Sequence, residues 1–366
     1  MSTTSSNTSH ATSPTTSPKQ ASPTSTTSST HGPTTATAST ITSSPTKTQA
    51  AIETLSSILP TPLSISSSLS AAFLLNSPDV SAQISTLLRH PTSGSGDNQL
   101  CRWLYDTFQS SDPSLQLVVL RFIPLISGMY LTRITQRKPL AGFEAVLLAL
   151  YAHETTARDG QATSVTIPDL CNPSIYHESS SNAPTRANNS TDLNIAVISP
   201  SLEPHGTVRS TRRARIVGVA LELFHSKIWV MPVESKIDFC EFFEIWTGQV
   251  DIGKANNGDK SNSNSNTTTK KLGRIPLAWE LLQPCLRILG HCLLSEDNNC
   301  RKNNSTSSEL YEKARSACKC LYVRAMHDVN PKAILAAGSL LKIIKLEEDL
   351  GDFDPTEITT NRIISV

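Results

Sequence analysis

Cysteine and histidine side chains gather toward the C-terminal part of the chain, where zinc coordination is the first chemistry to consider. Six of them fall within 36 residues: Cys285, His291, Cys292, Cys300, Cys318 and Cys320. Structural zinc sites usually contain a Cys-x-x-Cys pair, and this stretch has none. Cys285 and Cys292 are instead seven residues apart, on one stripe of a predicted helix. We therefore expect buried core thiols and no metal site.

Motifs typical of catalysis are also missing from the sequence. It contains no nucleophile elbow, no Gly-rich phosphate loop after a strand and no His-Glu-x-x-His motif. His177 lies between Tyr176 and Glu178, which would suit proton transfer, but a lone histidine among prolines and apolar residues more often forms a structural hydrogen bond. We expect a protein without catalytic residues or cofactors. A helical enzyme with an unrecognised site is the alternative.

A dense basic cluster marks the start of a predicted helix. Its members are Arg209, Arg212, Arg213 and Arg215. Such a cluster suits contact with an acidic lipid at a membrane surface or with an acidic protein partner, and a solvated helix start explains it equally well. Because the net charge of the whole chain is only +1, no binding to nucleic acid is expected.

The first 46 residues have the composition of a disordered tail. They contain 29 Ser and Thr, no Asp or Glu, and almost no large apolar side chain. Four Ser-Pro pairs are candidate phosphorylation sites, at Ser13, Ser17, Ser22 and Ser44, and an unmodified tail is the alternative. The tail has no acidic residues, as in an organelle transit peptide, but it also has no arginine, whereas transit peptides are rich in arginine. An organelle-targeted helical binding module is kept as a second alternative. Without a signal-peptide pattern, we expect a reducing compartment.

From about residue 46 onward, apolar residues recur at the three- and four-residue spacing of helices. N-cap and N1 residues predict helix starts at Ser77-Pro78, Asp97, Asp112-Pro113 and Asn330-Pro331, with a kink at Pro124. Further helices are predicted at 143–152, 216–229, 239–246, 277–294 and 310–327. Residues 162–178 are predicted to form an extended segment laid over helices.

The predicted fold class is therefore all-α, an irregular, solenoid-like array of about nine helices. It spans residues 47–349, with a polar linker at 178–193, a disordered insertion at 250–272 and a short tail at 350–366. The segments 115–126, 143–151 and 216–230 carry more apolar residues than a small bundle needs, which predicts a permanent partner. The plainer alternative is that they form the chain's own core.

Residues 165–178, Val-Thr-Ile-Pro-Asp-Leu-Cys-Asn-Pro-Ser-Ile-Tyr-His-Glu, resemble the hyccin family. The matching motif residues are Thr166, Ile167, Pro168, Pro173, Tyr176, His177 and Glu178. Weaker matches, among them Asp97 to Leu100, Arg274 to Pro276 and Leu310-Tyr311, extend the resemblance over about 50–345. The Ser/Thr-rich head and the insertion at 250–272 depart from the family pattern and would suit a plant member.

This resemblance implies a non-catalytic accessory subunit of a phosphatidylinositol 4-kinase complex. Members of the family bind a tetratricopeptide-repeat scaffold subunit through a helical domain. That scaffold assembles with the kinase catalytic subunit and a membrane-anchoring subunit. The resemblance implies a cytoplasmic protein recruited to the inner face of the plasma membrane, where peripheral contact with the membrane is expected. The motif residues would then be structural or form part of the interface.

Overall fold

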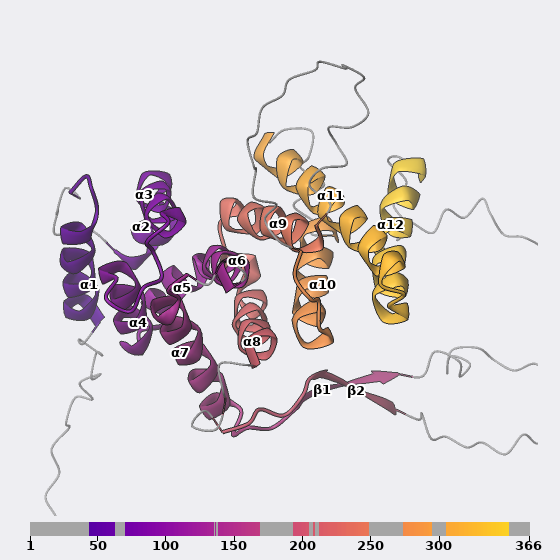
Figure 1. Cartoon of the computed structure of the whole chain (residues 1–366), viewed down its shortest axis with the longest axis horizontal. Coiled ribbons are helices and arrows are strands. Elements are labelled where there is room, and N and C mark those ends of the chain that lie inside the picture. Colours follow the sequence, from indigo (N-terminus) through magenta and orange to yellow (C-terminus); the bar gives the residue numbers. More distant parts are fainter. Residues whose placement is uncertain are drawn as a thin grey trace, which may run out of the picture. The chain divides into compact units, whose positions relative to one another are not determined.

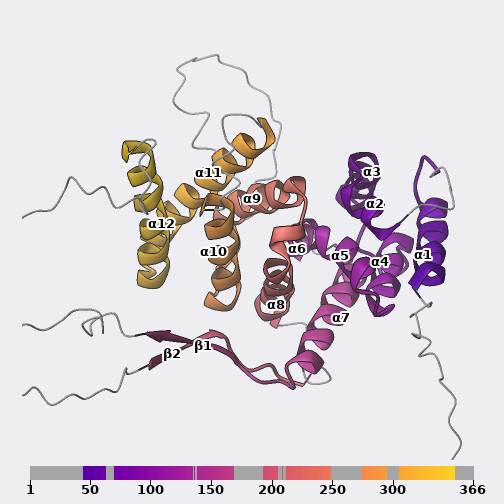
Figure 2. The ribbon, with the colours of Figure 1, turned by 180° about the vertical axis from the view of Figure 1, so that it is seen from behind.

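The protein folds as an array of α-helices with one pair of β-strands (Figures 1 and 2). The computed structural model describes residues 44–62, 70–134, 136, 138–168, 193–204, 208, 212–248, 274–294 and 305–350. The helices in these ranges are α1 (Ser44–Ile58), α2 (Ala71–Asn76), α3 (Pro78–Arg89), α4 (Gln99–Gln109), α5 (Pro113–Arg121), α6 (Ile123–Ile134), α7 (Ala141–Ala157), α8 (Arg213–Ser226), α9 (Val233–Thr247), α10 (Trp279–Leu294), α11 (Ser305–His327) and α12 (Pro331–Leu350). The all-α prediction is confirmed, although the helices outnumber the nine expected.

The helix starts follow the capping residues of the sequence, with one exception. The side chains of Ser77 and Asp112 accept hydrogen bonds from Val80 N and Ser114 N, and each is followed by a proline in the first turn. The prediction of Asp97 as the cap of α4 is wrong, because Asn98 accepts the bond from the N–H of Cys101, at 2.9 Å. Asn and Asp cap helices equally well, so two adjacent candidates cannot be separated by residue type.

The predicted kink at Pro124 is a full break between two helices. α5 ends at Arg121, α6 begins at Ile123, and their axes are bent by 45°. Proline has no N–H to donate at this point, and the hydroxyl of Ser235 on α9 donates to the carbonyl of Arg121 at 2.5 Å. No single helix of the described ranges is long and apolar enough to cross a membrane, while this bent pair passes the same test when both helices are taken together.

The three apolar segments predicted to face a partner form the chain's own core. Leu115, Val146 and Ile216, one from each segment, are all fully buried. α6 packs against α8 and α9, and α7 packs against α4 and α8. The partner prediction was therefore wrong for these segments, because each helix covers the apolar stripes of its neighbours. Trp229 is the exception, since 75% of its surface is exposed.

A buried arginine completes the C-terminal end of α3. The last carbonyls of a helix lack partners within that helix. Here the guanidinium of Arg133, which is 2% exposed, donates to the carbonyls of Arg89 and His90 at 3.2 and 2.7 Å and to the hydroxyl of Ser93 at 2.8 Å. Burial lowers the pKa of Arg133. The residue joins α6 to α3 by satisfying carbonyls that would otherwise be buried without donors.

The extended segment predicted at 162–178 is confirmed where the structure describes it, but its environment is not as expected. β1 (Thr163–Pro168) pairs antiparallel with β2 (Leu193–Ser199), with Val165 opposite Ala196 and Thr166 opposite Ile195. The side chains of residues 162–167 are exposed, including Val165 at 41% and Ile167 at 47%, so this part of the segment does not lie over helices. The predicted linker at 178–193 is mostly outside the described residues, and β2 was not predicted.

Candidate interaction surfaces

The arginine cluster divides into residues with different roles. Arg212 is 56% exposed and pairs with Glu203 at 2.6 Å. Arg215 is only 7% exposed and donates to the carbonyls of Pro200 and Ser201, at 3.1 and 2.6 Å. Arg215 thus ties the segment after β2 to the start of α8 and is not available to a lipid. Arg209 lies outside the described residues.

Arg213 faces inward, toward Tyr130 of α6. Tyr130 is 1% exposed, and its hydroxyl donates to Glu144 of α7 at 3.3 Å. Burial, with the nearby charge of Glu144, raises the pKa of Tyr130 to about 12, and a hydrogen bond with Arg213 acts in the opposite direction. Arg213 therefore helps to join α6, α7 and α8. Of the three described members of the cluster, Arg212 alone is largely exposed, and its charge is already paired.

The family motif begins on the exposed pair of strands, which we call the ribbon (β1 and β2). Thr166, Ile167 and Pro168 lie on β1, whereas Pro173, Tyr176, His177 and Glu178 lie outside the described residues. Opposed residues of an antiparallel pair share a face. Ile195 and Val197 therefore lie on the face of Thr166 and Ser164, and the other face carries Val165 and Ile167. All four aliphatic side chains are between 41% and 72% exposed. The described residues of the ribbon carry no charged side chain.

A cluster of charged side chains holds the base of the ribbon. Arg158, at the end of α7, donates to the hydroxyls of Ser199 and Thr163 at 2.8 and 3.1 Å. Ser199 in turn donates to Glu222 of α8 at 2.6 Å. Glu222 is 11% exposed and pairs with Arg158 at 3.8 Å and with Arg287 of α10 at 3.5 Å. One carboxylate thus connects both strands with three helices.

His225 lies one turn after Glu222 on α8, close to the same cluster. Burial lowers the pKa of His225 to about 4, and the positive charges of Arg287 and His291 act in the same direction. The imidazole is therefore neutral at physiological pH. It belongs to the packing between α8 and α10 and titrates only in acid.

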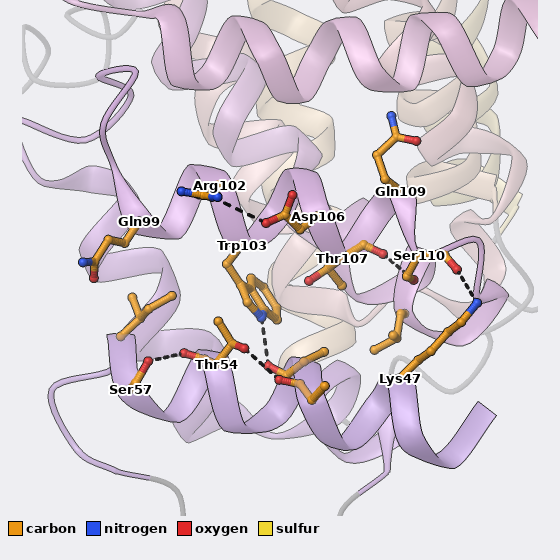
Figure 3. A pocket seen from close by; sticks show the side chains of 14 residues that line it. Lys47, Thr54, Ser57, Gln99, Arg102, Trp103, Asp106, Thr107, Gln109 and Ser110 are labelled. Carbon is orange, nitrogen blue, oxygen red and sulfur yellow. Dashed lines mark hydrogen bonds and ion pairs between the residues drawn. The ribbon is translucent and has the colours of Figure 1, made fainter. Parts of the chain in front are cut away.

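A groove of about 720 Å³ lies between α1 and α4 (Figure 3). The indole of Trp103 forms part of its floor and donates to the carbonyl of Ala51 at 2.9 Å. At one end Lys47 donates to the carbonyl of Ser110 at 3.1 Å, and an exposed pair of Arg102 and Asp106 lies along the rim. These polar groups are engaged with the protein itself and do not converge on one point. The groove is therefore a surface depression between two helices, and its polar groups do not form a binding site for one ligand.

Three of the cysteines predicted to be core thiols are buried in the structure. Cys285, Cys292 and Cys318 are at most 1% exposed, and Cys320 is half-buried. Burial raises the pKa of Cys285 beyond its ordinary range and that of Cys318 to about 12, so both stay protonated and unreactive. In the described ranges no three His, Cys, Asp or Glu side chains are placed to share a metal ion. Cys300 is outside those ranges.

Of the four candidate phosphorylation sites, one lies within the part of the chain that the structure describes. Ser44 is the first residue of α1, and Ser13, Ser17 and Ser22 lie outside the described residues.

Trp229 is the surface residue that the sequence pattern concealed. It falls on a short 3-10 turn, Ile228–Val230, between α8 and α9. Its neighbour Ile228 is 4% exposed, whereas Trp229 points outward. The apolar residues of α8 continue through this turn, so the sequence analysis included the indole in the apolar segment 216–230.

A comparison with known protein families agrees with this architecture. The family model described as Hyccin matches residues 66–360. The match covers well over half of the 366 residues and includes every helix from α2 to α12 and both strands. It also contains the Thr166-Ile167-Pro168 motif of β1. By this match, the chain belongs to the hyccin family.

Proposed function

We propose that this chain is a non-catalytic scaffold subunit that stabilises a phosphatidylinositol 4-kinase complex. In this proposal its helices pack against a tetratricopeptide-repeat subunit, which works with the kinase catalytic subunit and a membrane-anchoring subunit. The complex acts at the inner face of the plasma membrane, to which the cytoplasmic chain is recruited, and supports production of phosphatidylinositol 4-phosphate. The observation that carries the proposal is the Hyccin match over residues 66–360.

The exposed apolar side chains support a role in binding another protein. A tryptophan that is 75% exposed and a ribbon with aliphatic side chains on both faces are unfavourable in water. Aromatic residues are also enriched at the centres of protein interfaces. A helical-repeat partner offers grooves between its helices that would cover such side chains. Trp229 and the ribbon are the surfaces that we assign to this partner.

The test is co-purification from native membranes. The tagged full-length chain should recover a phosphatidylinositol 4-kinase and a tetratricopeptide-repeat subunit, identified by mass spectrometry. Co-expression with that subunit should also raise the yield of soluble chain, because the exposed apolar surfaces are then covered. Recovery of neither protein, from a chain that is well folded and monomeric by itself, would contradict the proposal.

A matched pair of variants locates the surface. Trp229→Ala should reduce recovery of the tetratricopeptide-repeat subunit, since truncation of a central interface aromatic typically lowers affinity by more than about tenfold. Phe73→Ala, on α2, removes another exposed aromatic side chain, 43% exposed, and should leave recovery unchanged. Equal loss in both variants would point to a general effect on folding.

A further inference from the structure

A stretch rich in Lys and Arg runs through the last two described helices, α11 and α12. Between Lys313 and Lys345 there are seven Lys and Arg residues and a single acidic residue, Asp328. The other acidic residues of the two helices flank this stretch: Glu309 and Glu312 precede it, and Glu347, Glu348 and Asp349 follow it. The whole of α11, Asp328 and α12 thus has a net charge of only +1. α11 and α12 pack against each other, as both views show (Figures 1 and 2). The positive charge is therefore confined to the stretch from Lys313 to Lys345.

Several of these cations already have partners within the protein. Lys313 pairs with Glu241 at 3.0 Å. Arg324 is 6% exposed and is bonded to Asp328 and to the carbonyls of Thr247 and Ile275. Asp328 is also bonded to Arg274, so the one acidic residue between Lys313 and Lys345 is fully engaged.

Other cations of the region remain open to solvent. Lys319 and Lys342 are exposed, and within the described part of the chain no carboxylate pairs with either. Each side chain keeps its flexible stem and its ammonium group for an external anion.

Helical spacing brings these two lysines onto one surface. Tyr322 of α11 touches Gly338 of α12, where a Cβ atom would lie 3.4 Å from the tyrosine ring. Residues three and four positions away share a helix face. Lys319 and Met326 therefore share the face of Tyr322, and Leu335 and Lys342 share the face of Gly338. Because the two faces meet at this contact, they form one continuous surface.

Exposed aliphatic side chains are interspersed with the lysines. Met326 is 52% and Leu335 is 71% exposed, and Val329, in the turn between the helices, is 78% exposed. Val329 also has φ +50°, a left-handed conformation that a β-branched residue rarely adopts. The N–H of Asn330 donates to the carbonyl of Ala325 at 3.0 Å, the bond of a helix end that ordinarily has glycine in this position. A strained, outward valine is thus retained where glycine would fit better.

We propose that Lys319, Met326, Val329, Leu335 and Lys342 form a membrane-contact surface that binds an anionic bilayer. Lipid phosphates would pair with the lysines, while the aliphatic side chains enter the boundary between headgroups and acyl chains. A bilayer suits this surface because it supplies both environments without a shaped pocket. The proposal goes beyond the scaffold role, does not depend on it, and assigns lipid contact to a place other than the arginine cluster.

Vesicle co-sedimentation of the purified full-length chain tests this assignment. The wild type should bind vesicles of phosphatidylcholine mixed with phosphatidylserine and should bind pure phosphatidylcholine weakly. Lys319→Ala combined with Lys342→Ala should lower partitioning onto the anionic vesicles roughly 30-fold, about fivefold for each lysine. Met326→Ser with Leu335→Ser should also weaken binding, without changing its dependence on salt.

A second double variant controls for net charge. Lys138→Ala combined with Lys227→Ala removes two exposed lysines elsewhere and lowers the net charge by the same amount. It should bind as the wild type does. Equal binding by the two lysine variants, equal binding to both kinds of vesicle, or binding to neither would overturn the proposal. Because every substituted lysine is exposed, we expect none of the lysine variants to unfold more easily than the wild type. Thermal melts of all variants check this. The scaffold role is judged separately, by recovery of the kinase assembly.

Discussion

Replacement of Glu222 by alanine tests how the ribbon is held on the helices. This carboxylate accepts a hydrogen bond from Ser199 of β2 and pairs with Arg158 and Arg287. Removing it leaves two guanidinium groups without their shared counter-charge and a β2 hydroxyl without its acceptor. Arg158 keeps its ion pair with Glu154 of α7, at 2.9 Å. The substitution therefore removes the link between the ribbon and α8, while Arg158 remains bound to α7.

The expected cost follows from the burial of the three partners. Breaking a fully buried ion pair costs about 3–5 kcal/mol, because the remaining charge stays desolvated. Glu222 and Arg158 are 11% and 12% exposed, but Arg287 is 30% exposed and can regain water. We therefore expect Glu222→Ala to lower the free energy of unfolding by about 2–3 kcal/mol. Glu222→Gln keeps an acceptor for Ser199 and should cost less.

Two measurements check this expectation. Denaturant unfolding gives the change in stability, and hydrogen exchange followed by mass spectrometry should show faster exchange in residues 163–168 and 193–199 than in α4. Asp106→Ala is the control, since it breaks an exposed pair with Arg102, at 3.8 Å, and should change stability by less than about 0.5 kcal/mol. Unchanged exchange in the ribbon of Glu222→Ala would refute the idea that this cluster anchors it.

Three further outcomes are expected. The pKa of His225 is lowered from 6.5 to about 4, so the unfolded state takes up the proton first as the pH falls. The stability that is present above about pH 6.5 should therefore be lost as the pH falls toward 4. In thermal melts over this pH range, the melting temperature of His225→Gln should fall less steeply than that of the wild type. Arg215→Ala should lower the free energy of unfolding by about 1–3 kcal/mol, because two charge-assisted hydrogen bonds are lost, whereas Arg212→Ala should change it by less than about 0.5 kcal/mol, and similar values in denaturant unfolding would contradict the assigned roles. Trp229→Ala should leave the thermal midpoint of the isolated chain nearly unchanged, since its indole is mostly in water, and a large decrease would place Trp229 in the core instead.

Several features of the fold were predictable because they depend on neighbours along the chain. Ser77 and Asp112 are each followed by a proline, and this pair of residues is typical of a helix start with a side-chain N-cap. The helical spacing that begins near residue 46 forms α1, and its residues Ile52 and Leu55 are fully buried. The cysteines of α10 could be assigned to the core from their spacing alone.

The candidate surfaces were less predictable because exposure depends on what packs against each helix. Four arginines close together in sequence look alike, yet Arg215 is buried against backbone carbonyls that come from the segment after β2. The apolar segments 115–126 and 143–151 were expected to contact a partner protein. They are instead buried within the chain, where α6 packs against α8 and α9, and α7 packs against α4 and α8. The lysines of α11 and α12 are dispersed in sequence, so only the contact of Tyr322 with Gly338 brings two of them onto one surface.

The sequence by itself determined that the chain is helical, where most helices begin, and which family it resembles, because periodicity, capping and motif identity are local properties. Only the tertiary structure decided which apolar and basic side chains remain in water. That division depends on the free-energy balance of burying each side chain against a specific neighbour. The partners of Glu222, which are Arg158, Ser199 and Arg287, lie far from it along the chain.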